Sequence, residues 1–292
     1  MKKKFLKSLY VAVVAFFGCL LAQFGFGEVI ENPVDLSKAG DTVSILSVGQ
    51  ADSALISSGG KYCLIDAGYT IKGDTDAVSY MKNAGVKELE VLVITHFHID
   101  HTADIINVLN NFRVKNIIIP DLEIANIPTS SFFELFMDKI EDKKINIFPA
   151  KKGESYTIGN GTLTILDDTY NDMTVNDTSV ATLFRQDDFT FLSTGDGEGW
   201  YEKRLLEVFS EEVTLLVAGH HGSSTSSTQS FIEGVSPQMI AISAGEDNEY
   251  GHPHKEILEL YESKNIPYNI TFRDGTLVYS IKDKKLISEQ EK

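Results

Sequence analysis

The chain has 292 residues, of which 42% are hydrophobic and 23% are charged. These values are ordinary for a globular protein with a sizeable core, so they exclude a wholly disordered or low-complexity chain. The formal net charge of −16 repels polyanions, which argues against non-specific nucleic-acid binding through a basic patch. A local positive potential at a metal site could still accept one phosphate group.

Residues 1–27 have the pattern of an export segment. Four lysines, the last of them Lys7, precede an uncharged stretch from Ser8 to Gly27. The apolar centre of this stretch suits a secretory signal peptide, and its 20 residues also just suffice for an uncleaved membrane anchor. We therefore expect an exported protein, either released outside the cell or anchored in the membrane and facing outward.

Beyond this segment we expect a linker at 28–40, one domain at 41–286 and a tail at 287–292. The domain opens with a predicted β-meander, and strands and helices follow in mixed order. Helices are predicted at 74–83 (with Asp74 as the N-cap), 102–110, 129–143, 200–209 and 254–263. Strands are predicted at 43–48, 54–57, 62–65, 89–95, 114–119, 145–148, 162–166, 179–185, 189–193, 213–218 and 239–243, with a final strand pair within 268–281. Strands and helices in both halves indicate an α/β (α+β) fold of two packed sheets with helices outside.

The strongest chemical signal is the run Thr95-His96-Phe97-His98-Ile99-Asp100-His101, which directly follows an apolar strand. His96 and His98 are two residues apart, so in an extended loop both imidazoles can chelate one metal. Asp100 and His101 can then turn toward a second metal. This set of nitrogen and oxygen donors favours two divalent ions, Zn²⁺ or Mn²⁺. The alternative is a solvated histidine-rich loop, which the preceding buried strand disfavours.

Five further segments accompany the histidine run in a fixed order along the chain. They are Val48-Gly49-Gln50-Ala51-Asp52-Ser53, Leu64-Ile65-Asp66-Ala67-Gly68, Ser193-Thr194-Gly195-Asp196, Gly219-His220-His221-Gly222-Ser223-Ser224 and Asn248-Glu249-Tyr250-Gly251-His252-Pro253. The ordered set resembles the metallo-β-lactamase superfamily, and within it the hydrolase domain of ComEC-type competence proteins and their secreted relatives. This resemblance extends over about residues 41–281 and implies a four-layer αββα sandwich with a two-metal site.

The resemblance also assigns roles to single residues. It implies that Asp196 bridges the two metals and that Asp66 supports the metal ligands through hydrogen bonds. His220 is favoured as a ligand of the second metal and His221 as a residue that contacts substrate, although the two could be exchanged. His252 is expected to protonate the leaving oxygen or to grip the anionic group beside it.

Other residues near these motifs have weaker assignments. Asn248 and Tyr250 are expected to line the pocket, and His254 to face solvent on the helix that follows. Most superfamily members place a further histidine ligand between the first cluster and the bridging aspartate, but this chain has no histidine between His101 and His220. Asn176 or Asp177 could fill that position, or the first metal could have fewer protein ligands.

The leading functional hypothesis is phosphodiester hydrolysis outside the membrane, in which a metal-bridging hydroxide attacks phosphorus and Asp100 orients it. The substrate would be extracellular DNA or a phosphoester-bearing wall polymer. The alternatives are a carbon-ester or lactone hydrolase of the same fold and a non-catalytic binding module. The sequence specifies neither the substrate nor the oligomeric state.

Overall fold

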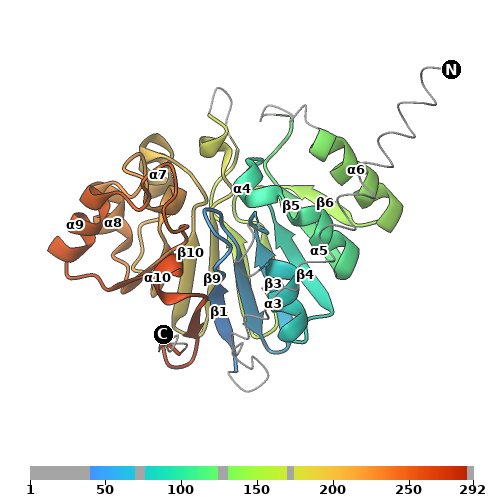
Figure 1. Ribbon diagram of the computed structural model, residues 1–292, viewed down its shortest axis with the longest axis horizontal. Coiled ribbons are helices and arrows are strands. Elements are labelled where there is room, and N and C mark those ends of the chain that lie inside the picture. The colour runs from blue at the N-terminus through green and yellow to red at the C-terminus, as the bar shows by residue number, and fades with distance from the viewer. Residues whose placement is uncertain (1–39, 70–75, 124–130, 170–173, 288–292) are drawn as a thin grey trace, which may run out of the picture. The chain divides into compact units, whose positions relative to one another are not determined.

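Two β-sheets form the centre of the fold (Figure 1). The computed structural model describes residues 40–69, 76–123, 131–169 and 174–287, and all of these belong to the unit Val34–Lys292. The predicted export segment, most of the predicted linker and almost all of the predicted tail lie outside the described residues. Across the described residues, the first sheet has the strand order β15-β14-β1-β2-β3-β4-β5-β6 and the second has the order β13-β12-β11-β10-β9-β8-β7.

The strands of the first sheet are β1 (Thr42–Ile45), β2 (Ala54–Ser58), β3 (Lys61–Ile65), β4 (Glu88–Val93), β5 (Arg113–Ile119), β6 (Asn146–Pro149), β14 (Leu277–Ser280) and β15 (Lys285–Leu286). Those of the second are β7 (Ser155–Ile158), β8 (Gly161–Ile165), β9 (Thr182–Gln186), β10 (Phe189–Ser193), β11 (Leu215–Val217), β12 (Met239–Ile242) and β13 (Tyr268–Ile270). The predicted opening meander is confirmed, because β2 pairs antiparallel with both β1 and β3, its neighbours along the chain. β3 to β6 and β10 to β13 run parallel.

Alternation along the strands divides the core into separate layers. Within β2, Leu55 packs into an outer cluster, whereas Ala54 and Ile56 pack between the two sheets. In β10, Phe191 lies between the sheets, and Leu192 packs against the helices on the far side. Because successive side chains of a strand point to opposite faces, one apolar run serves two layers at once. This pattern explains why the strands read as continuous apolar runs.

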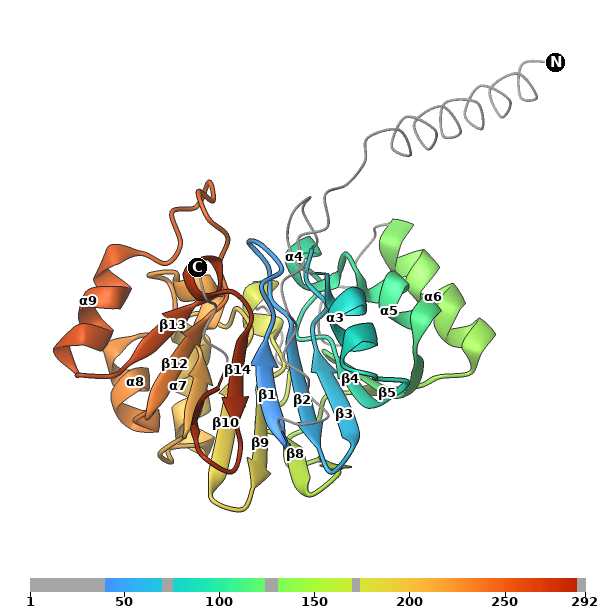
Figure 2. The ribbon, with the colours of Figure 1, turned by 60° about the horizontal axis from the view of Figure 1, so that its bottom comes forward.

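Helices cover the outer face of each sheet (Figure 2). On the first sheet these are α3 (Ala77–Asn83), α5 (Ile105–Asn111) and α6 (Ser131–Lys143), and on the second they are α7 (Gly199–Val208), α8 (Gln229–Val235) and α9 (Lys255–Ser263). The layers are therefore helix, sheet, sheet and helix, which confirms the predicted αββα fold. No helix of the described residues combines the length and apolarity needed to cross a bilayer.

The structure differs from the predicted elements in three ways. The helix after β4 begins inside the histidine run as α4 (Ile99–Thr102), three residues earlier than predicted. The predicted final pair is wrong as a pair, because β13 pairs with β12 in one sheet and β14 with β1 in the other. The turn between them is a short helix, α10 (Thr271–Asp274). Strands β7 and β15 and helix α8 were not predicted from the sequence, since each is short and weakly patterned.

The first helix also begins later than predicted. Asp76, and not the predicted Asp74, caps α3, and its carboxylate accepts a hydrogen bond from the Ser79 amide. Asp74 lies outside the described residues. Chain reversal after this helix occurs at Gly85, whose φ of +77° suits a glycine just past a helix end.

Candidate metal centre

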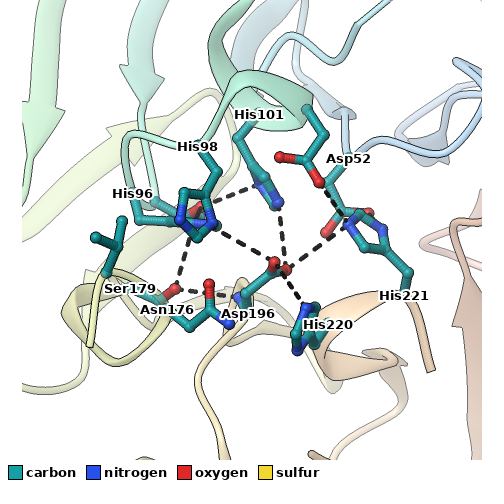
Figure 3. A network of polar contacts seen from close by, with 12 residues as sticks. Asp52, His96, His98, His101, Asn176, Ser179, Asp196, His220 and His221 are labelled. Carbon is teal, nitrogen blue, oxygen red and sulfur yellow. Dashed lines mark hydrogen bonds and ion pairs between the residues drawn. The ribbon is translucent and has the colours of Figure 1, made fainter. Parts of the chain in front are cut away.

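The candidate site lies where parallel strands of both sheets end, which is the usual place for ligands in such sheets. Asp66 follows β3, the histidine run follows β4, and Asp196 follows β10. The turn η2 (Gly219–Gly222), which contains two histidines, follows β11. Figure 3 shows the side chains of His96, His101, His220 and His221 converging on Asp196.

Asp196 joins two groups of possible metal ligands. It is 1% exposed, and its Oδ2 lies 3.7 Å from Nε2 of His96, while its Oδ1 lies 3.2 Å from Nε2 of His101. Within each group the ligating atoms all lie within 4.8 Å of one another. The first group is His96, His98 and Asp196; the second is Asp100, His101, Asp196 and His221. Each carboxylate oxygen of Asp196 therefore faces a different group, which suits a carboxylate that bridges through both oxygens.

His101 is oriented by Asp66. The Nδ1 hydrogen of His101 is donated to Oδ2 of Asp66 across 2.7 Å, so Nε2 is the nitrogen that faces Asp196. Asp66 is itself held by the amide of Thr95 at 2.8 Å and by the Thr95 hydroxyl at 2.6 Å. The structure thus places Asp66 behind the ligands, where the sequence analysis expected it.

His221 has the same arrangement in the second group. Its Nδ1 donates to the backbone carbonyl of Ser243 at 3.0 Å, and Oδ1 of Asp52 lies 3.4 Å from the same nitrogen. A carbonyl can only accept, so Nδ1 carries a hydrogen and Nε2 is the nitrogen that faces inward. Nε2 lies 3.3 Å from Oδ2 of Asp100.

His220 belongs to neither group. Its Nε2 lies 3.7 Å from Oδ2 of Asp196, and its Nδ1 lies 3.1 Å from the Thr225 hydroxyl. The sequence favoured His220 as the ligand and left an exchange open; the geometry groups His221 with the ligands instead. Both histidines have left-handed backbone, with φ of 50° and 55°, which non-glycine residues rarely adopt. No sequence pattern specifies which side chain such a turn directs inward.

The first group is less enclosed than the second. His96 is fully buried, with Nδ1 3.2 Å from the Thr95 hydroxyl and Nε2 3.0 Å from Nδ1 of His98. His98, by contrast, is exposed. With Asp196 these histidines supply three donors, one fewer than the usual tetrahedral set.

Asn176 is a candidate for a fourth donor. Its Nδ2 donates to Oε1 of Glu198 at 3.0 Å, and because a carboxylate only accepts, this contact fixes the orientation of the amide. Its Oδ1 is buried without a hydrogen-bond partner among the described residues. Figure 3 shows this oxygen pointing toward His96 and His98.

Asp177 is less suited to that part, because each of its oxygens accepts a hydrogen bond from another residue. Oδ2 accepts from the Thr174 hydroxyl at 2.9 Å, and Oδ1 accepts from the Glu198 amide at 3.0 Å. Asp177 thus braces the turn η1 (Asn176–Thr178) against the start of α7. Of the two residues proposed from the sequence, the geometry favours Asn176.

The buried carboxylates impose strong electrostatic demands on the imidazoles. Burial by itself lowers the pKa of His101 and of His221, but the surrounding aspartates raise both pKa values well above their usual range. Burial also lowers the pKa of His96 well below its usual range, because no carboxylate compensates it as fully. Despite the opposing effect of burial, His221 and His101 lower the pKa of Asp100 to about 2. The second group is therefore anionic enough to require compensating positive charge.

This donor set fits two divalent metal ions. Among the described residues, Oδ1 of Asn176 is buried without a hydrogen-bond partner, and Nε2 of His101 and Oδ1 of Asp196 face only each other across 3.2 Å. Unpaired polar atoms at the centre of a buried cluster are costly unless a cation completes their coordination. Imidazole nitrogens and carboxylate oxygens suit Zn²⁺ and Mn²⁺.

A loop beside the second group carries the remaining predicted residues. The amide of Asn248 donates to the carbonyls of Gly245 and His252 and accepts from the His252 and Tyr250 amides, so Asn248 braces the loop. The ring of Tyr250 is exposed and lies nearly parallel to the ring of His252, with centroids 5.6 Å apart. His252 also lies 5.4 Å from the ring of His220.

The sequence predicted that His254 faces solvent on the following helix, but its ring also connects two loops. Its Nδ1 accepts from the amide of Ser224 at 2.9 Å, and its Nε2 donates to the carbonyl of Tyr250 at 3.1 Å. It joins the loop after η2 to the loop of His252. The chain has seven histidines, and every one of them lies in or beside the candidate site.

Two residues of the site received no role from the sequence. Gln50 and Asp52 lie in the loop after β1, where Asp52 faces His221 and Gln50 lies 3.2 Å from Nδ1 of His252. Their segment was part of the family resemblance, which was the available signal. Their contacts join positions about 170 and 200 residues apart, and no local pattern reveals such pairs.

Comparisons with known proteins agree with this geometry. ComE operon protein 3 of Bacillus subtilis (strain 168) is 26% identical, and the match covers 85% of this chain and 34% of that protein. Competence protein ComA of Neisseria gonorrhoeae is 25% identical over 87% of this chain and 34% of its own length. Recombination protein 2 of Haemophilus influenzae is 26% identical over 77% of this chain and 27% of its own length. The chain spans about a third of the length of these relatives. The predicted resemblance to competence-type hydrolase domains is thereby confirmed.

Solved structures show the same fold. The metallo hydrolase Igni18 of Ignicoccus hospitalis matches with a TM-score of 0.54 at 15% identity, covering 82% of this chain and 98% of that one. The metallo-beta-lactamase fold protein YhfI of Bacillus subtilis matches with a TM-score of 0.54 at 16% identity, covering 82% and 99%. The family described as the Metallo-beta-lactamase superfamily matches residues 46–236. This range includes the histidine run, Asp196 and η2. The chain belongs to the metallo-beta-lactamase superfamily.

Proposed function

We propose that this protein is a two-metal phosphodiesterase that acts outside the membrane. The observation that carries the proposal is the position of Asp196, whose two carboxylate oxygens face two separate groups of ligands. A one-metal site needs only one such group. A binding module without metal would have no use for the buried amide oxygen of Asn176, which has no hydrogen-bond partner among the described residues.

His96, His98, Asp196 and Asn176 would hold the first ion, and Asp100, His101, Asp196 and His221 the second. Two divalent ions at these positions supply Lewis acidity and lower the pKa of water to near neutrality, which is the chemistry that hydrolysis requires. Asp100 remains a carboxylate at neutral pH, and its side chain is 27% exposed, against 1% for Asp196. It is therefore the carboxylate of the second group best placed to accept a hydrogen bond from an attacking water.

Two imidazoles outside the ligand groups favour an anionic substrate. His220 and His252 lie beside the ligands, with ring centroids 5.4 Å apart, and neither belongs to a ligand group. Imidazole N–H groups can hold the oxygens of a phosphodiester while the ester bond breaks. The likeness to competence proteins favours DNA as the substrate, whereas the net charge of −16 favours a smaller phosphoester.

The proposed location rests on residues 1–27 of the sequence. Their lysines and uncharged stretch have the order of a secretory signal or membrane anchor. An exported phosphodiesterase would meet extracellular DNA or phosphoesters of wall polymers, such as choline phosphoesters. Fractionation of cells that produce the full chain tests this part, and protein confined to the cytoplasm would contradict it.

Hydrolysis of bis(p-nitrophenyl) phosphate by the full chain tests the activity. We expect turnover with added Mn²⁺ or Zn²⁺, none with a chelator, and none in an Asp100→Asn variant. Asp138→Asn is the matched control, because Asp138 is an exposed aspartate of α6. Protein that contains metal but hydrolyses only p-nitrophenyl acetate would overturn the phosphodiesterase proposal and indicate a carbon-ester hydrolase. Protein that takes up no metal would indicate a binding module.

A further inference from the structure

We infer that Gln50 is a positioning residue that fixes His252 as a hydrogen-bond donor through Nε2, aimed at an oxygen of the substrate. The part of this inference that concerns substrate rests on the proposed function. The part that concerns the imidazole ring stands on hydrogen bonds within the protein alone.

The orientation of the Gln50 amide follows from a backbone contact. The amide N–H of Gly245 donates to Oε1 of Gln50 at 3.1 Å, and a backbone N–H can only donate, so its partner must be the amide oxygen. The other end of the Gln50 amide must therefore be its NH₂ group, which lies 3.2 Å from Nδ1 of His252. Gly245 permits this approach, because a Cβ there would lie 2.7 Å from the Gln50 backbone nitrogen.

This contact determines the tautomer of His252. Since the Gln50 NH₂ group can only donate, Nδ1 of His252 must accept, and the hydrogen of the neutral ring lies on Nε2. A protonated ring would direct a hydrogen from Nδ1 at the Gln50 NH₂ group, so the same contact requires a neutral ring.

The ring plane of His252 is fixed as well. The Tyr250 ring lies within 25° of parallel to it, and the His221 ring within 26°, with centroids 5.6 and 6.2 Å away. Asn248 holds both the amide and the carbonyl of His252. Among the described residues, Nε2 of His252 has no hydrogen-bond partner, so this donor is available to a ligand.

A neutral imidazole of this kind stabilises negative charge by donating a hydrogen bond and does not transfer a proton. Of the two roles that the sequence left open for His252, the geometry favours gripping the anionic group. Gln50 acts through His252 and need not touch substrate.

Nuclear magnetic resonance on the metal-free full chain with ¹⁵N-labelled histidine tests the tautomer directly. Long-range ¹H–¹⁵N spectra distinguish a protonated from an unprotonated ring nitrogen, and a His252→Gln variant assigns the signal. We expect His252 to carry its hydrogen on Nε2, and Gln50→Leu to produce a mixture of tautomers. His254 is the internal control, because Ser224 and Tyr250 fix its tautomer independently of Gln50. A hydrogen on Nδ1 of His252, or an unchanged signal in Gln50→Leu, would overturn the inference.

Kinetics provide a second measurement. Removing one donor to a developing oxyanion costs about 10²-fold in kcat, so we expect that loss in His252→Leu and a smaller one, roughly tenfold, in Gln50→Leu. His252→Gln should retain more activity than His252→Leu, because its amide NH₂ can replace the Nε2 donor. Equal activity of His252→Gln and His252→Leu would contradict the donor role. An Nε2 tautomer in a protein without phosphodiesterase activity would refute the proposed function and leave the role of Gln50 intact.

Discussion

The two ligand groups that share Asp196 differ in how firmly the fold holds them. In the second group, His101 and His221 each donate Nδ1–H to an oxygen behind them, from Asp66 and Ser243 respectively. In the first group, Nδ1 of His96 faces only hydroxyl groups, and His98 is exposed. The second group is thus preorganised and contains two carboxylates, whereas the first is open and contains only the shared one. We therefore expect the second group to bind metal more tightly.

The largest effect should come from the residue that the two groups share. Asp196→Asn removes the shared carboxylate from both groups, and we expect hydrolysis of bis(p-nitrophenyl) phosphate to fall roughly a thousandfold or more. Steady-state rates at saturating metal measure this, with Asp138→Asn as the control. A loss of activity below tenfold would contradict the claim that Asp196 belongs to both groups.

The next prediction distinguishes the groups by the protons they hold. In the metal-free protein the raised pKa values keep His101 and His221 protonated at neutral pH, whereas the lowered pKa of His96 keeps it neutral. Metal must displace protons from the second group, so its affinity should rise as the pH rises, and that of the first should change little. Calorimetry in buffers of different ionisation enthalpy measures proton release for each binding event. Equal release from both would refute the distinction.

Removing the residue behind a ligand should have a moderate effect. Asp66→Asn weakens the acceptor that orients His101, and such changes typically cost about 10- to 100-fold in metal affinity. We expect this loss for the second ion only. Asp187→Asn is a close control, because Asp187 shares the left-handed backbone of Asp66 but is exposed and remote from the site. A loss of affinity confined to the first ion would reverse our assignment.

The smallest effect concerns the support of η2. Glu202 is fully buried in α7 and accepts from the backbone amide of Thr228 at 2.8 Å and from that of Ser227, in the loop after η2. Burial raises the pKa of Glu202 from 4.5 to about 7. The folded protein therefore holds this proton more tightly than the unfolded chain, so the resulting stability is present below about pH 4.5 and is lost as pH rises through 7.

Chemical denaturation across this pH range should show the effect. The free energy of unfolding should fall by up to about 3 kcal/mol more in the unmodified protein than in Glu202→Gln. Glu207→Gln, an exposed change on the same helix, should keep the slope of the unmodified protein. Identical slopes in the Glu202→Gln and unmodified proteins would show that Glu202 does not hold this proton.

Much of the fold could be predicted from the sequence, and so could the candidate ligands of the histidine run. This run follows a buried strand, and its candidate ligands all lie within six residues, so the local pattern sufficed. The rest of the site depends on contacts between distant loops, such as Asp52 with His221 and Gln50 with His252. The choice between His220 and His221 depends on a left-handed turn, and the placement of β13 and β14 on strand pairing across the chain. None of these leaves a local signal in the sequence.

Titration of Mn²⁺ into the metal-free full chain tests the central claim most directly. We predict two ions per chain with unequal affinities, loss of the tighter one in His221→Gln and loss of the weaker one in His98→Gln. Binding of a single ion, or retention of both ions in His221→Gln, would contradict the account of two ligand groups joined by Asp196.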